Sequence, residues 1–192
     1  EMSNGCICCT LREDLMIEVE KLAKAQKFDY LIIESTGISE PIPVAQTFSF
    51  ESEDGSIDLS KFSYIDTMVT VVDSFNFIKD FSSPEYLTDR NLTDIENDER
   101  TIVNLLTDQV EFANVILLNK TDLVSESQLR NLYDIINKLN PEAKIIPSNH
   151  SKVDIKNVIN TGMFDFEKAE ASAGWIKAVS YTHLTLPTSY AV

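Results

Sequence analysis

The chain has 192 residues, a length that suits one α/β domain with a real hydrophobic core. Its 43% hydrophobic and 24% charged residues are typical of a folded globular protein and argue against disorder. A formal net charge of −15 argues against binding to nucleic acids or to anionic membranes, because both need clustered cations. No apolar run is long enough to cross a bilayer.

Helices and strands are predicted to alternate along the chain. The capping-box pattern T-L-R-E at 10–13 predicts a helix to about residue 26, and the apolar run 28–34 predicts a buried parallel strand. Residues 39–41 (S-E-P) predict the start of a second helix. The later pattern predicts strands within 64–73, 113–119 and 143–146, and helical segments over 75–81, 95–109, 125–139 and 153–160.

This alternation predicts an α/β fold with a mostly parallel sheet and helices on both faces. Ligands of such sheets bind beyond the carboxyl ends of the strands. Polar residues that could bind a ligand follow three of the predicted strands, at Glu34 to Gly37, at Asp73 and at Asn119 to Asp122. The sequence therefore predicts one binding edge for all three.

The only three cysteines lie within four residues, at Cys6, Cys8 and Cys9. An odd number so closely spaced is not a disulfide framework, which favours a reducing, cytoplasmic compartment. Crowded thiolates suit Zn²⁺ or Cu⁺, and three sulfurs leave a fourth tetrahedral position open. The predicted helix that follows would favour the thiolate form. Two alternatives remain, namely cysteines that serve as small buried apolar residues and a redox pair of Cys6 with Cys9.

The sequence N-K-T-D at Asn119, Lys120, Thr121 and Asp122 follows an apolar strand. A carboxylate at the last position can accept two hydrogen bonds from the N–H donors of a guanine edge, whereas adenine presents the wrong donors and acceptors. The asparagine can bridge the base and neighbouring loops, and the lysine stem can lie along the base. A simple polar turn after a strand is the alternative.

The sequence E-S-T-G from Glu34 to Gly37 also follows an apolar run. An acidic residue at a strand end commonly faces Mg²⁺ through water, and a glycine three residues later lets the backbone approach a terminal phosphate. The phosphate-binding pattern G-x-x-x-x-G-K-[ST] does not occur in the 192 residues. The sequence thus contains the guanine-binding half of a nucleotide site without the phosphate loop.

The motifs G-C-I-C-C-T-L-R, I-E-S-T-G-I-S-E-P and N-K-T-D, in this order, resemble those of the CobW-like GTPases. These are metallochaperones related to the GTPases that deliver nickel to urease and hydrogenase, and the resemblance extends from about Met2 to Ala178. It implies a three-layer P-loop NTPase-like fold whose first strand and phosphate loop precede Glu1. It also implies GTP hydrolysis with Mg²⁺, and delivery of Zn²⁺ or another transition metal to a client metalloprotein.

The resemblance assigns roles to individual residues. Cys6, Cys8 and Cys9 would be the metal ligands, and Glu34 and Gly37 would lie on the Mg²⁺ and γ-phosphate side of the catalytic site. Asn119, Lys120 and Asp122 would bind guanine, with 148–150 (S-N-H) matching a further base-contacting loop only loosely. Residues 1–178 are thus expected to form a partial GTPase domain. The tail 179–192 does not continue the family pattern, and we expect it to be foreign to the domain.

Three functions remain open at this point. The first is a GTP-hydrolysing metal chaperone, in which nucleotide orders the cysteine loop and hydrolysis releases it. The second is a zinc-binding regulatory or buffering module that hydrolyses nothing, since without a phosphate loop the 192 residues alone are expected to be inactive. The third is a thiol redox sensor. A phosphate loop upstream of Glu1 would favour the first.

Overall fold

The computed structural model describes residues 9–35, 37, 39–48, 56–90 and 100–172. Its sheet contains three parallel strands in the order β1-β2-β3, formed by Val69–Asp73, Val115–Asn119 and Lys144–Pro147. Asp73 stands opposite Asn119 in the register of β1 and β2. The fold class is therefore confirmed as α/β with a parallel sheet, and the strands end together at one edge, as the sequence predicts.

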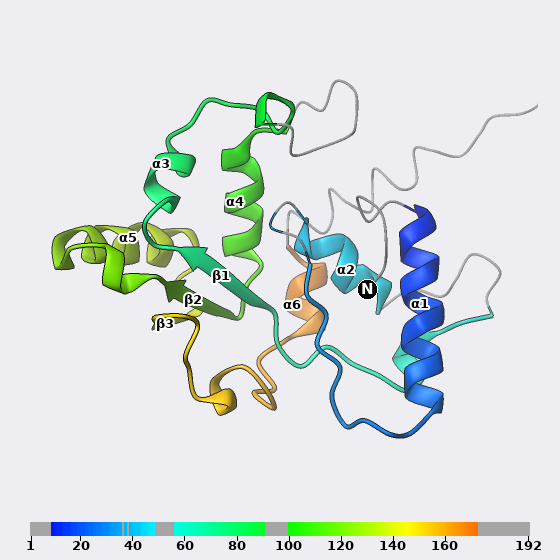
Figure 1. Ribbon diagram of the computed structural model, residues 1–192. Helices are drawn as coiled ribbons and strands as arrows, with labels where there is room; N and C mark the ends of the chain where they lie inside the picture. The colour runs from blue at the N-terminus through cyan, green and yellow to red at the C-terminus, as the bar shows by residue number, and fades with distance from the viewer. Residues whose placement is uncertain (1–8, 36, 38, 49–55, 91–99, 173–192) are drawn as a thin grey trace, which may run out of the picture.

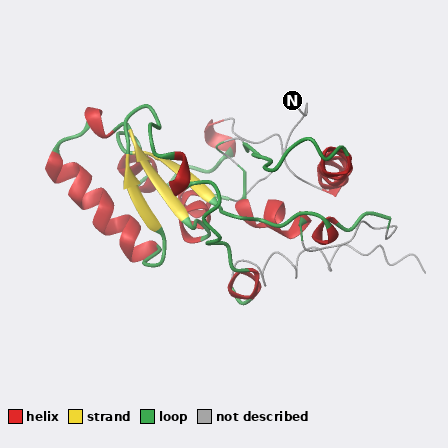
Figure 2. Cartoon of the chain, turned by 90° about the horizontal axis from the view of Figure 1, so that it is seen from below, coloured by secondary structure: helices red, strands yellow, loops and turns green. Residues whose placement is uncertain are grey.

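Six α-helices accompany this sheet in the described part of the chain (Figure 1). None of them is long and apolar enough to cross a membrane. Figures 1 and 2 agree that α1 and α2 lie to the side of the sheet, beyond the β1 edge. The helices are α1 (Cys9–Lys24), α2 (Pro41–Thr47), α3 (Phe77–Phe81), α4 (Ile102–Glu111), α5 (Glu126–Leu139) and α6 (Phe166–Glu170).

One face of the sheet forms the main hydrophobic core. Val72 and Leu118, which are register partners, are 3% and 1% exposed. Val110 of α4 and Ile136 of α5 belong to the same buried cluster, as does Phe77 of α3. These helices cover that face because their apolar residues recur at helical spacing toward the strands. The loops after β1 and β2 are therefore carried on a well-packed core.

A second set of contacts joins the N-terminal helices. Met16 and Val19 of α1 are buried against Val44 of α2 and Leu59, so α1 uses the helical spacing that the sequence predicts. On its other side α2 contributes Ala45 to a cluster that includes Phe112, the residue after α4. The segment that follows the E-S-T-G sequence is thereby packed against the end of α4.

The locally encoded helix starts agree closely with prediction. Helix α5 has the predicted capping box, in which Ser125 Oγ accepts from Gln128 N at 3.3 Å and Gln128 Oε1 accepts from Ser125 N at 2.9 Å. Helix α1 begins one residue before Thr10. Helix α4 begins at Ile102, and the predicted start near residue 95 lies outside the described residues. The predicted helix over 153–160 is instead a short 3-10 turn, Ile155–Asn157, and α6 was not predicted.

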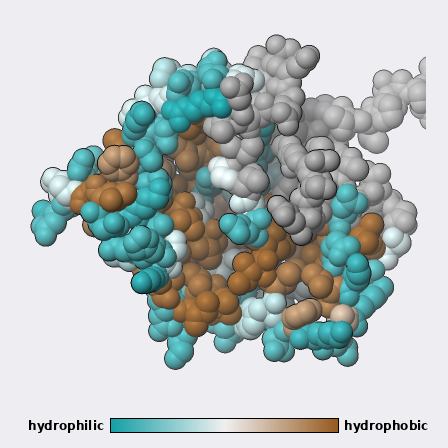
Figure 3. Space-filling model, in the orientation of Figure 1, coloured by the Kyte–Doolittle hydropathy of each residue, from teal (hydrophilic) through white to brown (hydrophobic). Residues whose placement is uncertain are grey.

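The predicted buried strand over 28–34 differs from the structure. These residues have no regular secondary structure, and Phe28, Leu31 and Ile32 are 67%, 48% and 74% exposed. An apolar run indicates a buried strand only where a neighbouring strand supplies backbone partners, and no described strand is paired with this segment. Along the nearby edge strand β1, Val71 is also 56% exposed. Figure 3 shows hydrophobic surface gathered in the middle of this face of the molecule.

Candidate functional site

The N-K-T-D loop begins at the last residue of β2. Lys120 has a left-handed backbone with φ of 61°, which turns the chain sharply into a 3-10 turn, Thr121–Leu123. The carboxylate of Asp122 is exposed and makes no hydrogen bond to any described residue. Such a carboxylate keeps all of its acceptor sites for a ligand. The donor set of a guanine edge fits it.

Asn119 joins this loop to the loop after β3. Its Oδ1 accepts from Ser151 N at 2.8 Å and more weakly from Ser148 Oγ at 3.4 Å. No described residue accepts from its Nδ2, so this group is available to donate to a ligand. The side-chain oxygen of Asn119 thus makes the predicted contact with a neighbouring loop. Its amide N–H groups suit an acceptor on a base, which is the other half of the predicted bridge.

Lys120 is held by Asp73, the last residue of β1. Lys120 Nζ donates to Asp73 Oδ2 at 2.7 Å, and Asn76 Nδ2 donates to the same oxygen at 2.8 Å. Partial burial raises the pKa of Asp73, but the hydrogen bonds from Lys120, Asn76 and the amide of Phe75 outweigh it, so the pKa lies below its ordinary value. Asp73 is therefore an anion at neutral pH that positions the lysine.

The loop after β3 supports the N-K-T-D loop from the other side. Asn149 Oδ1 accepts from Thr121 Oγ1 at 2.5 Å and from Asp122 N at 3.1 Å. Thr121 N also donates to Ser148 O at 3.3 Å. His150 lies beyond these contacts, with a left-handed φ of 52° and an exposed side chain. Of the three residues matched loosely to a base-contacting loop, two thus contact the N-K-T-D loop directly.

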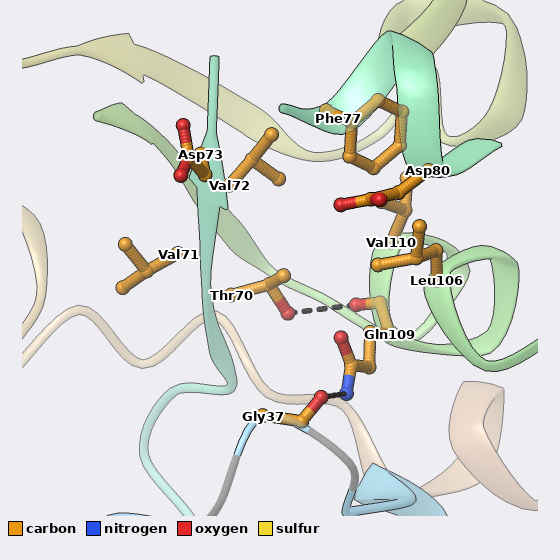
Figure 4. A pocket seen from close by; sticks show the side chains of 10 residues that line it. All are labelled: Gly37, Thr70, Val71, Val72, Asp73, Phe77, Asp80, Leu106, Gln109 and Val110. Atoms are coloured by element: carbon orange, nitrogen blue, oxygen red, sulfur yellow. Dashed lines mark hydrogen bonds between the residues drawn. The ribbon is translucent and has the colours of Figure 1, made fainter. Parts of the chain in front are cut away.

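Gly37 of the E-S-T-G sequence lies across a cavity from the end of β1. The cavity has a volume of about 160 Å³, which is too small for a whole nucleotide, and Figure 4 shows it between β1, α3 and α4. Glu34 is exposed and makes no hydrogen bond to a described residue. The residues that line the cavity include Gly37, Thr70, Asp73 and Gln109.

The N-K-T-D loop thus lies at the carboxyl end of β1, where Lys120 contacts Asp73, whereas Gly37 lies near the start of that strand, because Gln109 bonds to both Gly37 and Thr70 (Figure 4). The prediction of one binding edge for all three motifs is therefore wrong for Gly37, since the segment before it does not join the sheet as a strand.

Cys6 and Cys8 lie outside the described residues, and Cys9 is described only as the first residue of α1. No group of metal-ligating side chains occurs in the part of the chain whose side chains are described. The predicted metal ligands therefore stay a prediction from the sequence.

Two further residues organise these loops. Gln109 was not predicted from the sequence, whereas Asn149 belongs to the S-N-H segment that matches a base-contacting loop only loosely. Both act over long separations, since Gln109 contacts Gly37 and Ser39 while Asn149 contacts the loop at Thr121 and Asp122. A polar residue on a mostly apolar helix face was the only sequence signal for Gln109. The loose S-N-H match was the signal for Asn149.

Comparison with known proteins agrees with this arrangement. The family model described as "CobW/HypB/UreG, nucleotide-binding domain" matches residues 1–147. Among solved structures, the Zn(II)-bound YjiA GTPase from Escherichia coli is similar with a TM-score of 0.57 and 26% identity. The similarity covers 85% of this chain and 42% of that one.

Two curated relatives extend the comparison. A protein named zinc-regulated GTPase metalloprotein activator 1, from Dictyostelium discoideum, is 53% identical over 193 residues that cover all of this chain and 40% of the relative. A protein named zinc chaperone CobW, from Sinorhizobium sp., is 33% identical over 70% of this chain and 37% of its own length. The chain thus spans about two fifths of the length of the relatives it matches.

Proposed function

Because the chain belongs to the CobW/HypB/UreG family of nucleotide-binding domains, we propose that the full-length protein is a GTP-dependent metallochaperone. It would bind Zn²⁺ or a similar transition metal and deliver it to a client metalloprotein on GTP hydrolysis. The observation that carries this proposal is the N-K-T-D loop, in which an exposed Asp122 carboxylate without a hydrogen-bond partner among the described residues follows a lysine held by Asp73. Clustered thiols also suit a reducing, cytoplasmic location.

The proposed roles follow the family motifs. Asn119, Lys120 and Asp122 would bind guanine, which selects GTP over ATP by donor and acceptor pattern. Glu34 would face the Mg²⁺ that neutralises phosphate charge, and Gly37 would lie close to the γ-phosphate. The names of the relatives support both guanine nucleotide and zinc as ligands.

The cysteines would hold the metal as cargo. In sequence they lie directly before and at the start of α1, and α1 is followed by the segment that ends at Glu34 and Gly37. A nucleotide that orders the E-S-T-G loop can therefore bias the cysteine loop between two states. Coupling of this kind requires that the metal bind the two nucleotide states with different affinities.

The test is a zinc titration of the full-length protein with GTP or with GDP bound. We expect zinc affinity to be about tenfold higher with GTP, a typical coupling between two sites. The matched variant Cys8→Ser should lower zinc affinity in both states. Equal affinities with GTP and GDP would exclude the coupling, and zinc binding without any GTP hydrolysis would favour the buffering module instead.

A further inference from the structure

The carboxylate of Asp73 is held by several hydrogen bonds at the end of β1. Its Oδ1 accepts from the backbone amides of Phe75 at 3.0 Å and Asn76 at 3.3 Å. Its Oδ2 accepts from Asn76 Nδ2 at 2.8 Å and from Lys120 Nζ at 2.7 Å. All of these donors except Lys120 lie in the turn that follows β1. The position of the carboxylate is therefore set by this turn and not by the lysine.

The same turn also holds the first residue of the N-K-T-D loop. Asp73 and Asn119 are register partners, and Ser74 N donates to Asn119 O at 3.0 Å at the end of the two strands. Asn119 and Lys120 are thus both attached to the turn after β1, the first through its backbone and the second through its side chain.

The ion pair between Lys120 and Asp73 fixes where the lysine lies but adds little to the stability of the fold. The side chains of Lys120 and Asp73 are 48% and 31% exposed. Ion pairs this exposed contribute little to folding, because water screens the two charges. We therefore expect the pair to determine the position of the lysine, and its loss to leave the fold intact.

Lys120 lies in sequence between two groups that have no hydrogen-bond partner among the described residues, Asn119 Nδ2 and the Asp122 carboxylate. A base that contacted both of these groups would pass over the residue between them. The half-exposed stem of Lys120 offers such a base an apolar surface. The ammonium at the end of this stem already has a carboxylate as its partner, so its positive charge is offset within the protein.

We propose that Asp73 is a positioning residue for guanine binding, which holds the ammonium of Lys120 at the end of β1 so that the lysine stem packs against the base. The inference rests on the proposed function. It assigns the lysine to the base and not to the phosphates, because Asp73 offsets the charge that would attract a phosphate. Loss of the Asp73 carboxylate should then weaken the binding of GDP and of GTP by the same factor.

The test combines Asp73→Asn with Lys120→Met in a double-mutant cycle on the full-length protein, with GDP and GTP affinities measured by titration calorimetry. Asparagine keeps the oxygen that accepts from the amides of Phe75 and Asn76 but replaces the oxygen that Lys120 contacts by an N–H donor. We expect Asp73→Asn to lower both affinities about tenfold. In the Lys120→Met background it should change either affinity less than about twofold, because the residue through which Asp73 acts is then absent.

Asp80→Asn is the matched control. Asp80 Oδ1 accepts from Arg90 Nη1 at 2.7 Å, the same distance as that from Lys120 Nζ to Asp73 Oδ2. Figure 4 shows Asp80 on α3, away from Asp73 on β1. The control thus removes one negative charge from an ion pair of the same length without a change at Lys120. It should alter both affinities less than about twofold.

A second variant tests the inference if Asp73→Asn does not fold. Asn76→Ala leaves the Asp73 carboxylate in place but removes the side-chain donor that holds its Oδ2. We expect both affinities to fall about threefold, and only while Lys120 is present.

The outcomes separate this inference from the proposed function. Unchanged affinities, or equal losses with and without Lys120, would show that Asp73 does not act through the lysine and would overturn the inference. A gain in affinity, or a larger loss for GTP than for GDP, would assign the ammonium to a phosphate and would overturn it as well. A wild-type protein that binds neither nucleotide would contradict the proposed function itself, and the inference would fall with it.

Discussion

The backbone N–H of Asp122 donates to the side-chain Oδ1 of Asn149, yet the two residues are expected to contribute differently to nucleotide binding. The carboxylate of Asp122 is free of described partners and can accept from a base. Asn149 has its Oδ1 engaged within the protein, where it supports the loop at Thr121 and at Asp122. We therefore expect Asp122 to select the base and Asn149 to hold the selecting loop in shape.

Asp122→Asn should change the preference among purine nucleotides in the full-length protein. The substitution replaces one acceptor by a donor, so GTP affinity should fall while xanthosine triphosphate, which presents an acceptor at that position, should gain. A shift in relative affinity of about a hundredfold is expected for reversal of one buried donor–acceptor match. Competition titrations with both nucleotides measure it, and an unchanged preference would contradict the base-binding role.

Asn149→Ala should weaken nucleotide binding without changing the preferred base. It removes the acceptor for Thr121 Oγ1 and Asp122 N, so the loop must be ordered by the ligand itself. The expected loss of affinity is about tenfold for both GTP and GDP, equivalent to about 1.4 kcal/mol. Asn137→Ala, an exposed asparagine on α5, is the matched control. A change in base preference would show that Asn149 contacts the base directly.

The candidate site was predictable where its residues adjoin in sequence. Asn119, Lys120 and Asp122 lie on one turn after one strand, so a short motif fixes their relative placement. The partner of Lys120 was not predictable, because the ion pair with Asp73 joins residues 47 positions apart and depends on the register of two strands. The 72-residue separation of Gln109 from Gly37 has the same consequence.

Among the elements, α4 and α5 are joined at their ends by one buried side chain. Asn140 follows α5 and is 8% exposed. Its Nδ2 donates to three carbonyls at the end of α4, those of Val110 at 2.8 Å, Glu111 at 3.1 Å and Ala113 at 2.9 Å. Its Oδ1 accepts from the amides of Glu142 and Ala143. The turn into β3 is therefore fixed to the turn into β2.

Asn140→Leu should destabilise the protein by about 2 to 4 kcal/mol. Leucine has the same number and branching of side-chain heavy atoms but leaves buried carbonyl and N–H groups without partners, and each such group carries a desolvation cost of about 1 to 3 kcal/mol. Urea unfolding followed by circular dichroism measures the change. Asn137→Leu on the exposed side of α5 should change the unfolding free energy by less than about 0.5 kcal/mol. Equal effects of the two substitutions would show that the Asn140 network contributes nothing specific.

The elements that the sequence predicts well are those with local determinants. The α5 start needs only Ser125 and Gln128, and β2 needs only an uninterrupted apolar run. The segment over 28–34 has an apolar run of the same kind, but a strand forms only beside a paired neighbour. The sequence of the segment alone does not show whether such a neighbour is present. Helix α6 has five residues and an Asp165 cap, too short for a periodic signal.

At the scale of the whole molecule, an aspartate at each end of β1 forms hydrogen bonds to a neighbouring segment of the chain. Asp73 holds the loops at the carboxyl end, as described above. Asp66, which precedes the strand, accepts from the amides of Thr161 at 3.1 Å and Gly162 at 2.8 Å and so attaches the chain after β3 to the opposite end of the sheet. The two ends of the fold therefore depend on carboxylates that stay ionised.

Lowering the pH should weaken the hydrogen bonds of Asp66 and Asp73 at the two ends of β1. Desolvation raises the pKa of Asp66, but hydrogen bonds from Gly162, Thr67 and Thr161 outweigh it, so the pKa lies below its ordinary value, as it does for Asp73. An aspartate with a lowered pKa binds more protons in the unfolded state. Its stabilising contribution is thus present above the ordinary aspartate pKa and is lost as the pH falls through the folded-state value.

Asp66→Asn should therefore make the free energy of unfolding less dependent on pH in the acid range. At about pH 7 the variant is expected to be less stable than the wild type. The difference should shrink as the pH falls below the ordinary aspartate pKa and through the lower folded-state value, because the wild-type carboxylate is then protonated. Urea midpoints across this range measure both chains. The matched control is Asp134→Asn, an exposed aspartate of α5 without a described hydrogen bond, which should keep the wild-type dependence. The difference in unfolding free energy between wild type and Asp66→Asn could instead stay constant across the range. Asp66 would then hold the segment after β3 through uncharged contacts and not through its negative charge.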